Sequence, residues 1–255
     1  MSVLEQFRLD GRVAVVTGAG RGIGRSIAIG LAEAGCDVVV TARRAHEIEA
    51  VAREIEQLGR RALAVPGDIR LPETSRAVVA AAVDAFGKLD IYVNNAGGAE
   101  DRTMRQLAKT PDEAWSDQIG LNLDAVFFGA RAALEQLTSD GSIVNIASMV
   151  AGRPSPYNGP YAAAKAAVVQ LTTTLAAEQA KRGIRVNCVS PGPIPTEVFM
   201  EALKITDEAL PAIAANVPLG RLGTGEDVAA AVVYLCSPAA SWITGHNLVV
   251  TGGMS

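Results

Sequence analysis

The sequence lacks the features that mark membrane, metal-binding and secreted proteins. No apolar run reaches the ~20 residues of a membrane helix. The first ten residues have no apolar core of the kind that a signal peptide needs. Cys36, Cys188 and Cys236 show no metal-ligand spacing, and such an odd, scattered set is typical of reduced thiols. We therefore expect a cytoplasmic protein with no membrane span and no metal.

Basic tracts are also absent. The formal net charge is −4, whereas a protein that neutralises many phosphates carries clustered Lys and Arg. His46 and His246 stand alone in the sequence, without the partner spacing of a metal site or a catalytic pair. We expect a small-molecule partner and no nucleic acid.

What the chain does contain is a large supply of small apolar residues. Hydrophobic residues make up 49% of the 255 residues and aromatic residues only 4%. Ala, Val, Gly and Leu dominate, and such side chains suit helices packed closely on a parallel sheet. The length fits one large α/β domain, and no linker divides it.

Short apolar runs alternate with longer helical patterns along the chain. The predicted strands are residues 13–17, 37–42, 62–65, 89–94, 142–147, 185–190 and 247–250. The predicted helices are residues 22–35, 45–58, 73–86, 111–137, 158–182 and 226–236. Because each strand is continuously apolar, both of its faces should be buried. The order predicts a single α/β domain over residues 1–255: a doubly wound, seven-stranded parallel sheet with helices on both faces.

A glycine-rich stretch, Thr17-Gly18-Ala19-Gly20-Arg21-Gly22-Ile23-Gly24, joins the first strand to the first helix. Glycines let the backbone approach a pyrophosphate at the positive end of a helix. An ordinary structural turn is the alternative, but the strand before and the helix after are the context that dinucleotide binding requires. No Gly-Lys-Ser/Thr ending is present, which excludes a phosphate-loop NTPase.

The end of the second strand, residues 40–44, carries no carboxylate for a ribose 2′-hydroxyl. Arg43, with Arg21 from the glycine turn, could instead pair with a 2′-phosphate, which a guanidinium fork fits well. The alternative is that these arginines are solvated surface. We predict NADP(H) as the preferred coenzyme, with NAD(H) as the alternative.

Three residues of the later strands and helices predict the chemistry. Ser148 follows the fifth strand, and Tyr161 and Lys165 share one face of the next helix because they are four residues apart. A free tyrosine has a pKa near ~10, and we expect the Lys165 ammonium to lower it so that Tyr161 can exchange a proton. Ser148 would bind the substrate oxygen, and a nicotinamide would supply the hydride.

These motifs resemble the short-chain dehydrogenase/reductase family over nearly the whole chain. The matching stretches are Thr17–Gly24, Asn94-Asn-Ala-Gly97, Asn122, Ser148, Tyr161-x-x-x-Lys165 and Pro191-Gly192. The resemblance implies a Rossmann fold and makes Asn122 a fourth catalytic residue that bends its helix. The coenzyme-binding residues that sequence and resemblance together suggest are Gly18, Gly20, Arg21, Gly22, Ile23, Arg43, Asp68, Ile69, Asn94, Ala96, Gly97, Tyr161, Lys165, Pro191, Gly192, Ile194 and Thr196.

In particular, the resemblance implies that Asp68 holds the adenine amino group and that Asn94, Ala96 and Gly97 lie against the adenosine ribose. Asn187 would be structural. The final Gly245–Gly253 stretch resembles a family segment found in tetramer interfaces, so we expect a homotetramer.

The substrate pocket should be closed by a lid around residues 194–217. Ser148, Met149, Tyr157 and Phe199 are the candidate substrate residues, although Phe199 equally fits the buried face of a short helix. The region up to Trp242 resembles bacterial hydroxysteroid dehydrogenases and favours a fairly apolar alcohol or ketone. The overall pattern equally resembles 3-oxoacyl-carrier-protein reductases. A third reading is a non-catalytic, NADP-binding sensor, which the intact catalytic set disfavours.

Overall fold

A computed structural model of the chain describes residues 2–98 and 105–254. Within them, seven parallel strands form one sheet in the order β3-β2-β1-β4-β5-β6-β7. The strands are β1 Val13–Thr17, β2 Asp37–Ala42, β3 Ala62–Pro66, β4 Leu89–Asn94, β5 Leu137–Ile146, β6 Arg185–Pro191 and β7 Asn247–Val250. The predicted Rossmann-like sheet is confirmed, and none of the described helices is long and apolar enough to cross a membrane.

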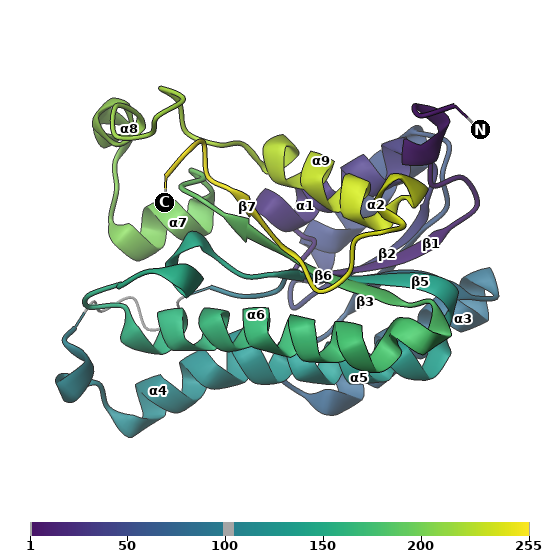
Figure 1. The fold of residues 1–255 in the computed structure, drawn as a ribbon, viewed down its shortest axis with the longest axis horizontal. Coiled ribbons are helices and arrows are strands. Elements are labelled where there is room, and N and C mark those ends of the chain that lie inside the picture. The colour runs from purple at the N-terminus through teal and green to yellow at the C-terminus, as the bar shows by residue number, and fades with distance from the viewer. Residues whose placement is uncertain (1, 99–104, 255) are drawn as a thin grey trace.

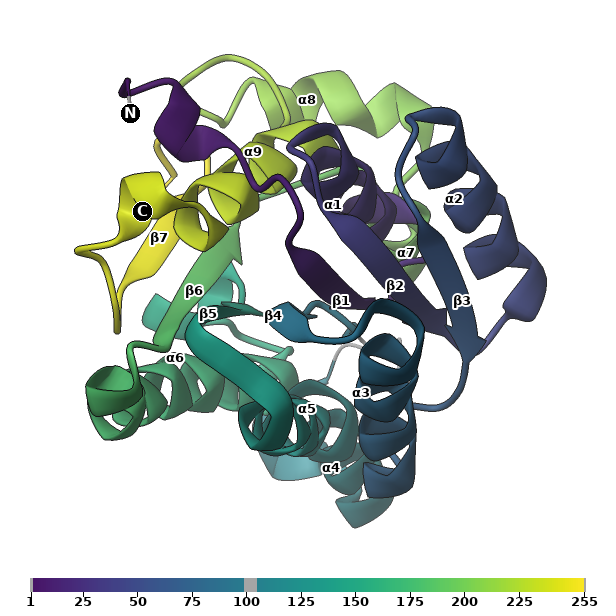
Figure 2. The same ribbon diagram turned by 90° about the vertical axis from the view of Figure 1, so that its right-hand side faces the viewer.

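Helices cover both faces of this sheet (Figures 1 and 2). One layer holds α1 Gly22–Glu33, α2 Ala45–Gln57 and α9 Gly225–Cys236. The other holds α3 Pro72–Phe86, α4 Asp112–Ile119, α5 Ala125–Gln136 and α6 Gly159–Gln179. Two short helices, α7 Glu197–Leu203 and α8 Leu210–Ala214, lie beyond the carboxyl ends of the strands (Figure 1).

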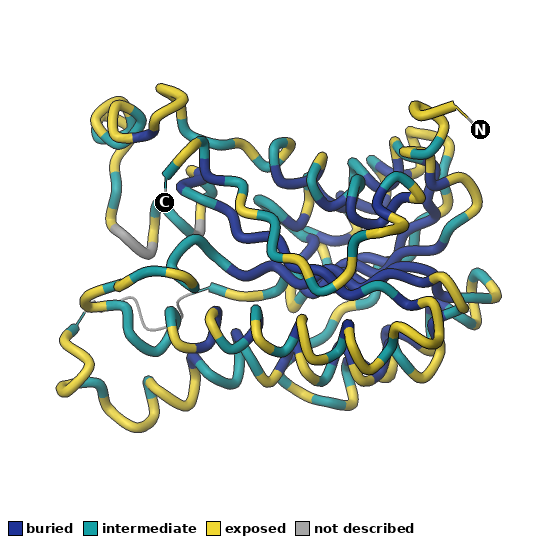
Figure 3. Tube along the Cα trace, in the orientation of Figure 1, coloured by how far each residue is buried: buried dark blue, intermediate teal, exposed yellow. Residues whose placement is uncertain are grey.

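The inner strands are largely buried on both faces because their apolar runs do not alternate with polar residues, whereas the edge strands β3 and β7 are only partly buried, contrary to our expectation for every strand. On β1, Ala14 and Val16 pack in one hydrophobic cluster and Val13 and Val15 pack in another, across the sheet. The sheet is accordingly the most buried part of the trace (Figure 3). This arrangement is the one that a period-2 backbone between two helical layers requires.

The helix predicted at residues 111–137 is interrupted. It consists of α4, a π-helical segment at Gly120–Asp124 and α5, and β5 already begins at Leu137. Leu89 pairs with Leu137 and Ile91 with Ser142, so the β5 backbone bulges between these two pairs. Tertiary pairing with β4 therefore overrides the local helical pattern at Leu137.

The strand order places a crevice between β1 and β4. The chain leaves β1 toward β2 on one side, and β4 is followed by β5 on the other. Ligands of open α/β sheets bind at such a switch point, outside the carboxyl ends of the strands. The glycine turn after β1 and the segment after β4 both lie there.

Candidate active site

Asn95, which follows β4, connects the end of that strand to the glycine turn by hydrogen bonds. The sequence analysis named its neighbours Asn94 and Ala96 but not Asn95. The Asn95 Nδ2 donates to the carbonyl oxygens of Thr17 at 2.8 Å and Gly18 at 3.2 Å. A Cβ on Gly24 would lie 2.1 Å from the Gly18 oxygen and 2.4 Å from the Asn95 Nδ2, so α1 can approach only with glycine there. The signal in the sequence was the second asparagine of the Asn94-Asn95 pair.

The turn fits a dinucleotide pyrophosphate. Gly18 and Gly22 have φ of 63° and 53°, the left-handed region that favours glycine. Arg21, the residue before α1, makes no side-chain cap on the helix, so the first N–H groups of α1 have no side-chain acceptor from this N-cap. Such N–H groups are the donors that bind pyrophosphate oxygens.

The segment after β4 runs from the turn toward the centre of the crevice. The N–H groups of Asn95 and Ala96 both donate to the Thr17 Oγ1, at 3.0 Å each. A Cβ on Gly97 would lie 2.8 Å from the Asn122 Oδ1 and 3.0 Å from the Lys165 Nζ. The predicted coenzyme segment therefore leads directly to two of the predicted catalytic side chains.

Asn94 plays a different part from its neighbours. Its side chain is buried and donates to the Asn145 Oδ1 at 2.9 Å, and the Asn145 Nδ2 donates to the Thr172 Oγ1 at 2.9 Å. This buried chain of hydrogen bonds ties β4, β5 and α6 together. The resemblance had implied that the segment of Asn94, Ala96 and Gly97 lies against a ribose. The Asn94 side chain, however, points into the interior.

The four predicted catalytic residues come together, and we call them, with Gly97, the catalytic corner. Ser148 follows β5, Tyr161 and Lys165 lie on α6, and Asn122 lies in the π-helical segment. The Ser148 side chain lies near enough to the Tyr161 phenol to act on its pKa, and the Lys165 Nζ lies 5.7 Å from the centre of the Tyr161 ring. Asn122 and Lys165 are buried, whereas Ser148 and Tyr161 are partly exposed.

Lys165 is 3% exposed, and its Nζ donates to the carbonyl oxygen of Ile146 at 2.8 Å. Burial disfavours the charged amine and lowers the pKa of Lys165 to about 8, while the nearby Cys188 opposes this shift. The group is therefore protonated at neutral pH but close to its titration range.

The pKa of Tyr161 moves in the direction opposite to our expectation. Burial raises the pKa of the phenol, and the hydrogen bond with Ser148 opposes that rise. The Lys165 ammonium donates to the Ile146 carbonyl, and burial of the phenol outweighs any pull from this neighbour. In this structure the Tyr161 phenol therefore holds its proton more tightly than a free tyrosine does.

Asn122 is fully buried and holds the backbone of Gly98 from both sides. Its Oδ1 accepts from the Gly98 N–H and its Nδ2 donates to the Gly98 oxygen, both at 2.9 Å. The Nδ2 also lies 3.1 Å from the Gln118 Oε1, a contact that the sequence did not reveal. The π-helical segment at Asn122 is the bend that the resemblance implied.

Four charged side chains follow the carboxyl ends of β1, β2, β3 and β6, and we call them, after the coenzyme role expected for the first three, the coenzyme rim: Arg21, Arg43, Asp68 and Glu197. Asp68 is paired with Arg70 at 2.6 Å, and that hydrogen-bonded pair, with a smaller effect from Arg43, lowers the pKa of Asp68. Ile69 is buried beside it. Arg21 reaches Glu197, in the first turn of α7, at 2.7 Å.

The ends of β6 and α7 bring the remaining predicted coenzyme residues to the crevice. Thr196 caps α7 by accepting from the Phe199 N–H at 3.2 Å, and its Cγ2 would lie 3.1 Å from a Cβ on Gly22. Ile194 is buried after Pro191-Gly192. The segment that follows β6 therefore contacts the glycine turn directly.

The candidate substrate residues do not form a compact group like the catalytic corner. Met149 and Phe199 are partly buried, near Ser148 and on α7 respectively. Tyr157 is 54% exposed with φ of 67°, and its carbonyl oxygen accepts from the Arg105 N–H at 3.1 Å. Asn187 is structural, as expected, because it bonds the backbone of Ile243 and His246.

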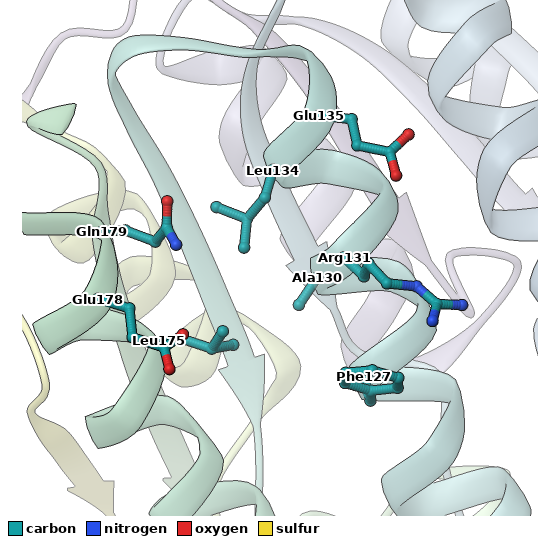
Figure 4. A pocket seen from close by; sticks show the side chains of 8 residues that line it. All are labelled: Phe127, Ala130, Arg131, Leu134, Glu135, Leu175, Glu178 and Gln179. Carbon is teal, nitrogen blue, oxygen red and sulfur yellow. The ribbon is translucent and has the colours of Figure 1, made fainter.

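Two hollows formed by described residues lie outside the catalytic corner. One of about 290 Å³ lies between α5 and α6 and is lined by Phe127, Leu134 and Leu175, among others (Figure 4). A smaller one of about 150 Å³ lies at the ends of β6 and β7, beside the Arg221–Asp227 ion pair. Among the described residues, no cluster of His, Cys, Asp or Glu side chains is suited to hold a metal ion.

A family model described as enoyl-(acyl carrier protein) reductase matches residues 18–255. The chain is 40% identical over 250 residues to a 3-oxoacyl-[acyl-carrier-protein] reductase of Vibrio cholerae, covering 97% of this chain and 99% of that protein. It is 39% identical over 250 residues to an L-rhamnose 1-dehydrogenase (NAD(P)(+)) of a Sphingomonas strain, covering 96% of this chain and 97% of that one.

The fold is also similar to a solved structure of 7α-hydroxysteroid dehydrogenase in complex with NADH and 7-oxo glycochenodeoxycholic acid. The TM-score is 0.91 at 36% identity, covering 99% of this chain and 98% of the other. These three relatives act, by their names, on an acyl thioester, a sugar and a steroid. Similarity at this level therefore does not separate substrates.

Proposed function

Because the chain belongs to the short-chain dehydrogenase/reductase family and is an oxidoreductase, we propose that it interconverts an alcohol and a ketone or aldehyde by hydride transfer with NADP(H). Tyr161 is the general acid and base. The observation that supports this best is that the Tyr161 phenol lies between the Ser148 side chain and the buried Lys165, whose Nζ is 5.7 Å from the centre of the Tyr161 ring.

In the proposed mechanism, each residue of the catalytic corner has a separate task. The nicotinamide coenzyme supplies or accepts the hydride. The Ser148 hydroxyl binds the carbonyl oxygen, and the Tyr161 phenol, held protonated by burial, donates its proton to that oxygen during reduction. Lys165 orients the nicotinamide ribose, and Asn122 fixes the backbone at Gly98 beside it.

The coenzyme preference is inferred from charge. Arg21 and Arg43 flank the adenosine side, and residues 40–44 contain no carboxylate that would bind a 2′-hydroxyl. The wild-type ratio of kcat/KM for NADPH over NADH tests this directly. A ratio below one would overturn the NADP(H) preference and leave the reaction class untouched.

The substrate is inferred to be a fairly apolar small molecule. Met149 and Phe199 supply partly buried apolar surface, and residues 194–217, with α7 and α8, form the lid. A 3-oxoacyl-carrier-protein reductase is the second candidate, favoured by the identity to the Vibrio cholerae enzyme. Acetoacetyl thioesters, steroid ketones, sugars and simple aldehydes, compared by NADPH absorbance, separate these candidates.

We also infer that one domain spans residues 1–255, and that the protein is a cytoplasmic homotetramer. All three cysteines are free and buried, in keeping with a reducing compartment. Near the Gly245–Gly253 stretch, Trp242 is 99% exposed and Val249, on the edge strand β7, is 53% exposed. The molar mass of the purified protein, measured by light scattering, tests whether four copies assemble.

The decisive test of the mechanism is Tyr161→Phe. This variant removes only the phenolic oxygen, so we expect turnover to fall by about 10³-fold, the contribution of a positioned general acid. The Kd of NADPH, measured by fluorescence, should change little, because the ring and Lys165 remain. Comparable activity in the variant would refute the mechanism, and no NADPH oxidation by wild type on any carbonyl would instead favour a non-catalytic, NADP-binding sensor.

A further inference from the structure

The Arg21 side chain is already paired with a carboxylate from a distant part of the chain. Its Nη1 donates to the Glu197 Oε2 at 2.7 Å, across 176 residues of sequence. Arg21 is the residue before α1, and Glu197 lies in the first turn of α7. The ion pair therefore connects the glycine turn to the short helix that lies beyond the carboxyl ends of the strands.

This connection is part of a larger contact. Thr196, adjacent to Glu197, would touch a Cβ on Gly22 at 3.1 Å, and it caps the same turn of α7. The Glu197 carboxylate is thus held beside the turn by the backbone of α7. The Glu197 side chain is 71% exposed and the Arg21 side chain 28% exposed, so the ion pair is open to solvent at Glu197.

A second carboxylate lies against the same turn. A Cβ on Gly20 would lie 2.9 Å from the Glu47 Oε2, and Glu47 is paired with Arg44. Because Glu47 is neutralised by its own arginine, the charge contact that a phosphate must replace at the turn is the Arg21–Glu197 pair. To bind Arg21, a phosphate must displace the Glu197 carboxylate.

We propose that Glu197 is a specificity-determining residue that competes with the 2′-phosphate of the coenzyme for the Arg21 guanidinium. The inference rests on the proposed NADP(H) site. Binding of the 2′-phosphate moves Arg21 from Glu197 to the ligand, so it also releases the charge contact that holds the start of α7. Glu197 thereby reduces the discrimination between NADPH and NADH that Arg21 would otherwise confer.

The test is Glu197→Gln, with Kd values for NADPH, NADH and adenosine 2′,5′-bisphosphate measured by fluorescence or calorimetry at low salt. Because an exposed ion pair contributes little free energy, its loss should change a Kd by about two- to fivefold. We expect the Kd of both 2′-phosphorylated ligands to fall by that factor and the Kd of NADH to remain unchanged. The difference should shrink at high salt, where such a pair is screened.

The matched control is Glu54→Gln. Glu54 pairs with Arg25, one turn further along α1, and its Oε1 lies 3.1 Å from the Arg25 Nε. This variant removes the same charge from another ion pair that involves α1, and it should change none of the three Kd values. In an Arg21→Ala background, Glu197→Gln should likewise have no effect, because the competition requires both side chains.

An equal shift for NADPH and NADH, an effect that persists without Arg21, or no effect at all would overturn the inference. The proposed coenzyme preference is tested separately, because only measurements on the wild-type protein decide it. If wild type binds NADH more tightly than NADPH, the preference is wrong, and the response of adenosine 2′,5′-bisphosphate to Glu197→Gln still decides the competition.

Discussion

In the catalytic corner, Asn122 and Lys165 are buried and bonded to backbone oxygens, whereas in the coenzyme rim Arg21 and Asp68 are partly exposed and paired with charged side chains. Buried hydrogen bonds that lose a partner leave a desolvated group behind, so each change is costly. Exposed ion pairs are individually weak and are screened by salt. Substitutions in the catalytic corner should therefore have larger effects than substitutions in the coenzyme rim.

After Tyr161→Phe, the largest expected effect comes from adding one methyl group to the catalytic corner. Gly97→Ala places a Cβ 2.8 Å from the Asn122 Oδ1 and 3.0 Å from the Lys165 Nζ, so both side chains must move. Because small displacements of catalytic groups are costly, we expect kcat to fall about 30-fold. Steady-state kinetics at saturating NADPH measure this.

The control for that variant is Gly120→Ala, since a Cβ there meets no atom within 4 Å and the position is helical. It should retain wild-type kcat and gain stability of about 0.5–1 kcal/mol from helix propensity. Equal kcat values for the two variants would show that Gly97 does not determine the spacing of the catalytic corner.

The second effect is a pH limit set by Lys165. Below about pH 8 the amine is charged, and above it the amine loses its proton, because burial lowers its pKa to about 8. We expect kcat/KM for reduction, which reports the free enzyme, to be level below pH 8 and to fall about tenfold per pH unit above it. The phenol of Tyr161 stays protonated over this range, because its pKa is raised.

The Lys165→Arg variant separates deprotonation of Lys165 from a general loss of activity at alkaline pH, because a guanidinium does not titrate in proteins. Whatever residual rate it retains should lack the decline above pH 8. A wild-type profile that stays level to pH 10 would mean that the charge of Lys165 does not matter for the rate.

The smallest effect lies in the coenzyme rim. Asp68→Asn removes the carboxylate that Arg70 binds at 2.6 Å and that we expect to hold the adenine amino group. Since NADPH and NADH share the adenine, the Kd of both should rise by about threefold, the value of one modest hydrogen bond. A response confined to NADPH would instead place Asp68 near the 2′-phosphate.

Most elements, and the convergence of Ser148, Tyr161 and Lys165 at the end of the sheet, could be predicted from the sequence, for a physical reason. Continuous apolar runs and helical periodicity are local, and the i, i+4 spacing of Tyr161 and Lys165 fixes their common face whatever surrounds them. The break of the 111–137 helix at Asn122 was implied by resemblance alone, since no Pro or unusual residue marks the π-helical segment.

The directions of individual side chains could not be predicted, because partners far apart in the sequence decide them. Asn94 and Asn95 are chemically identical, yet one bonds Asn145 inside the sheet and the other closes the glycine turn. The raised pKa of Tyr161 depends in the same way on how deeply the folded chain buries it. Likewise, nothing local to the glycine turn indicates that Arg21 reaches Glu197.

The position of β7 has a consequence for how the protein is made. Residues Cys188–Pro191 of β6 pair with Asn247–Val250, so the outer side of β6 is covered only by residues that are synthesised much later. Until those residues leave the ribosome, β6 is an open edge with unpaired backbone groups that can recruit other strands. A nascent chain or a truncation lacking residues 247–250 should therefore depend on chaperones and aggregate, even though every catalytic side chain is already present.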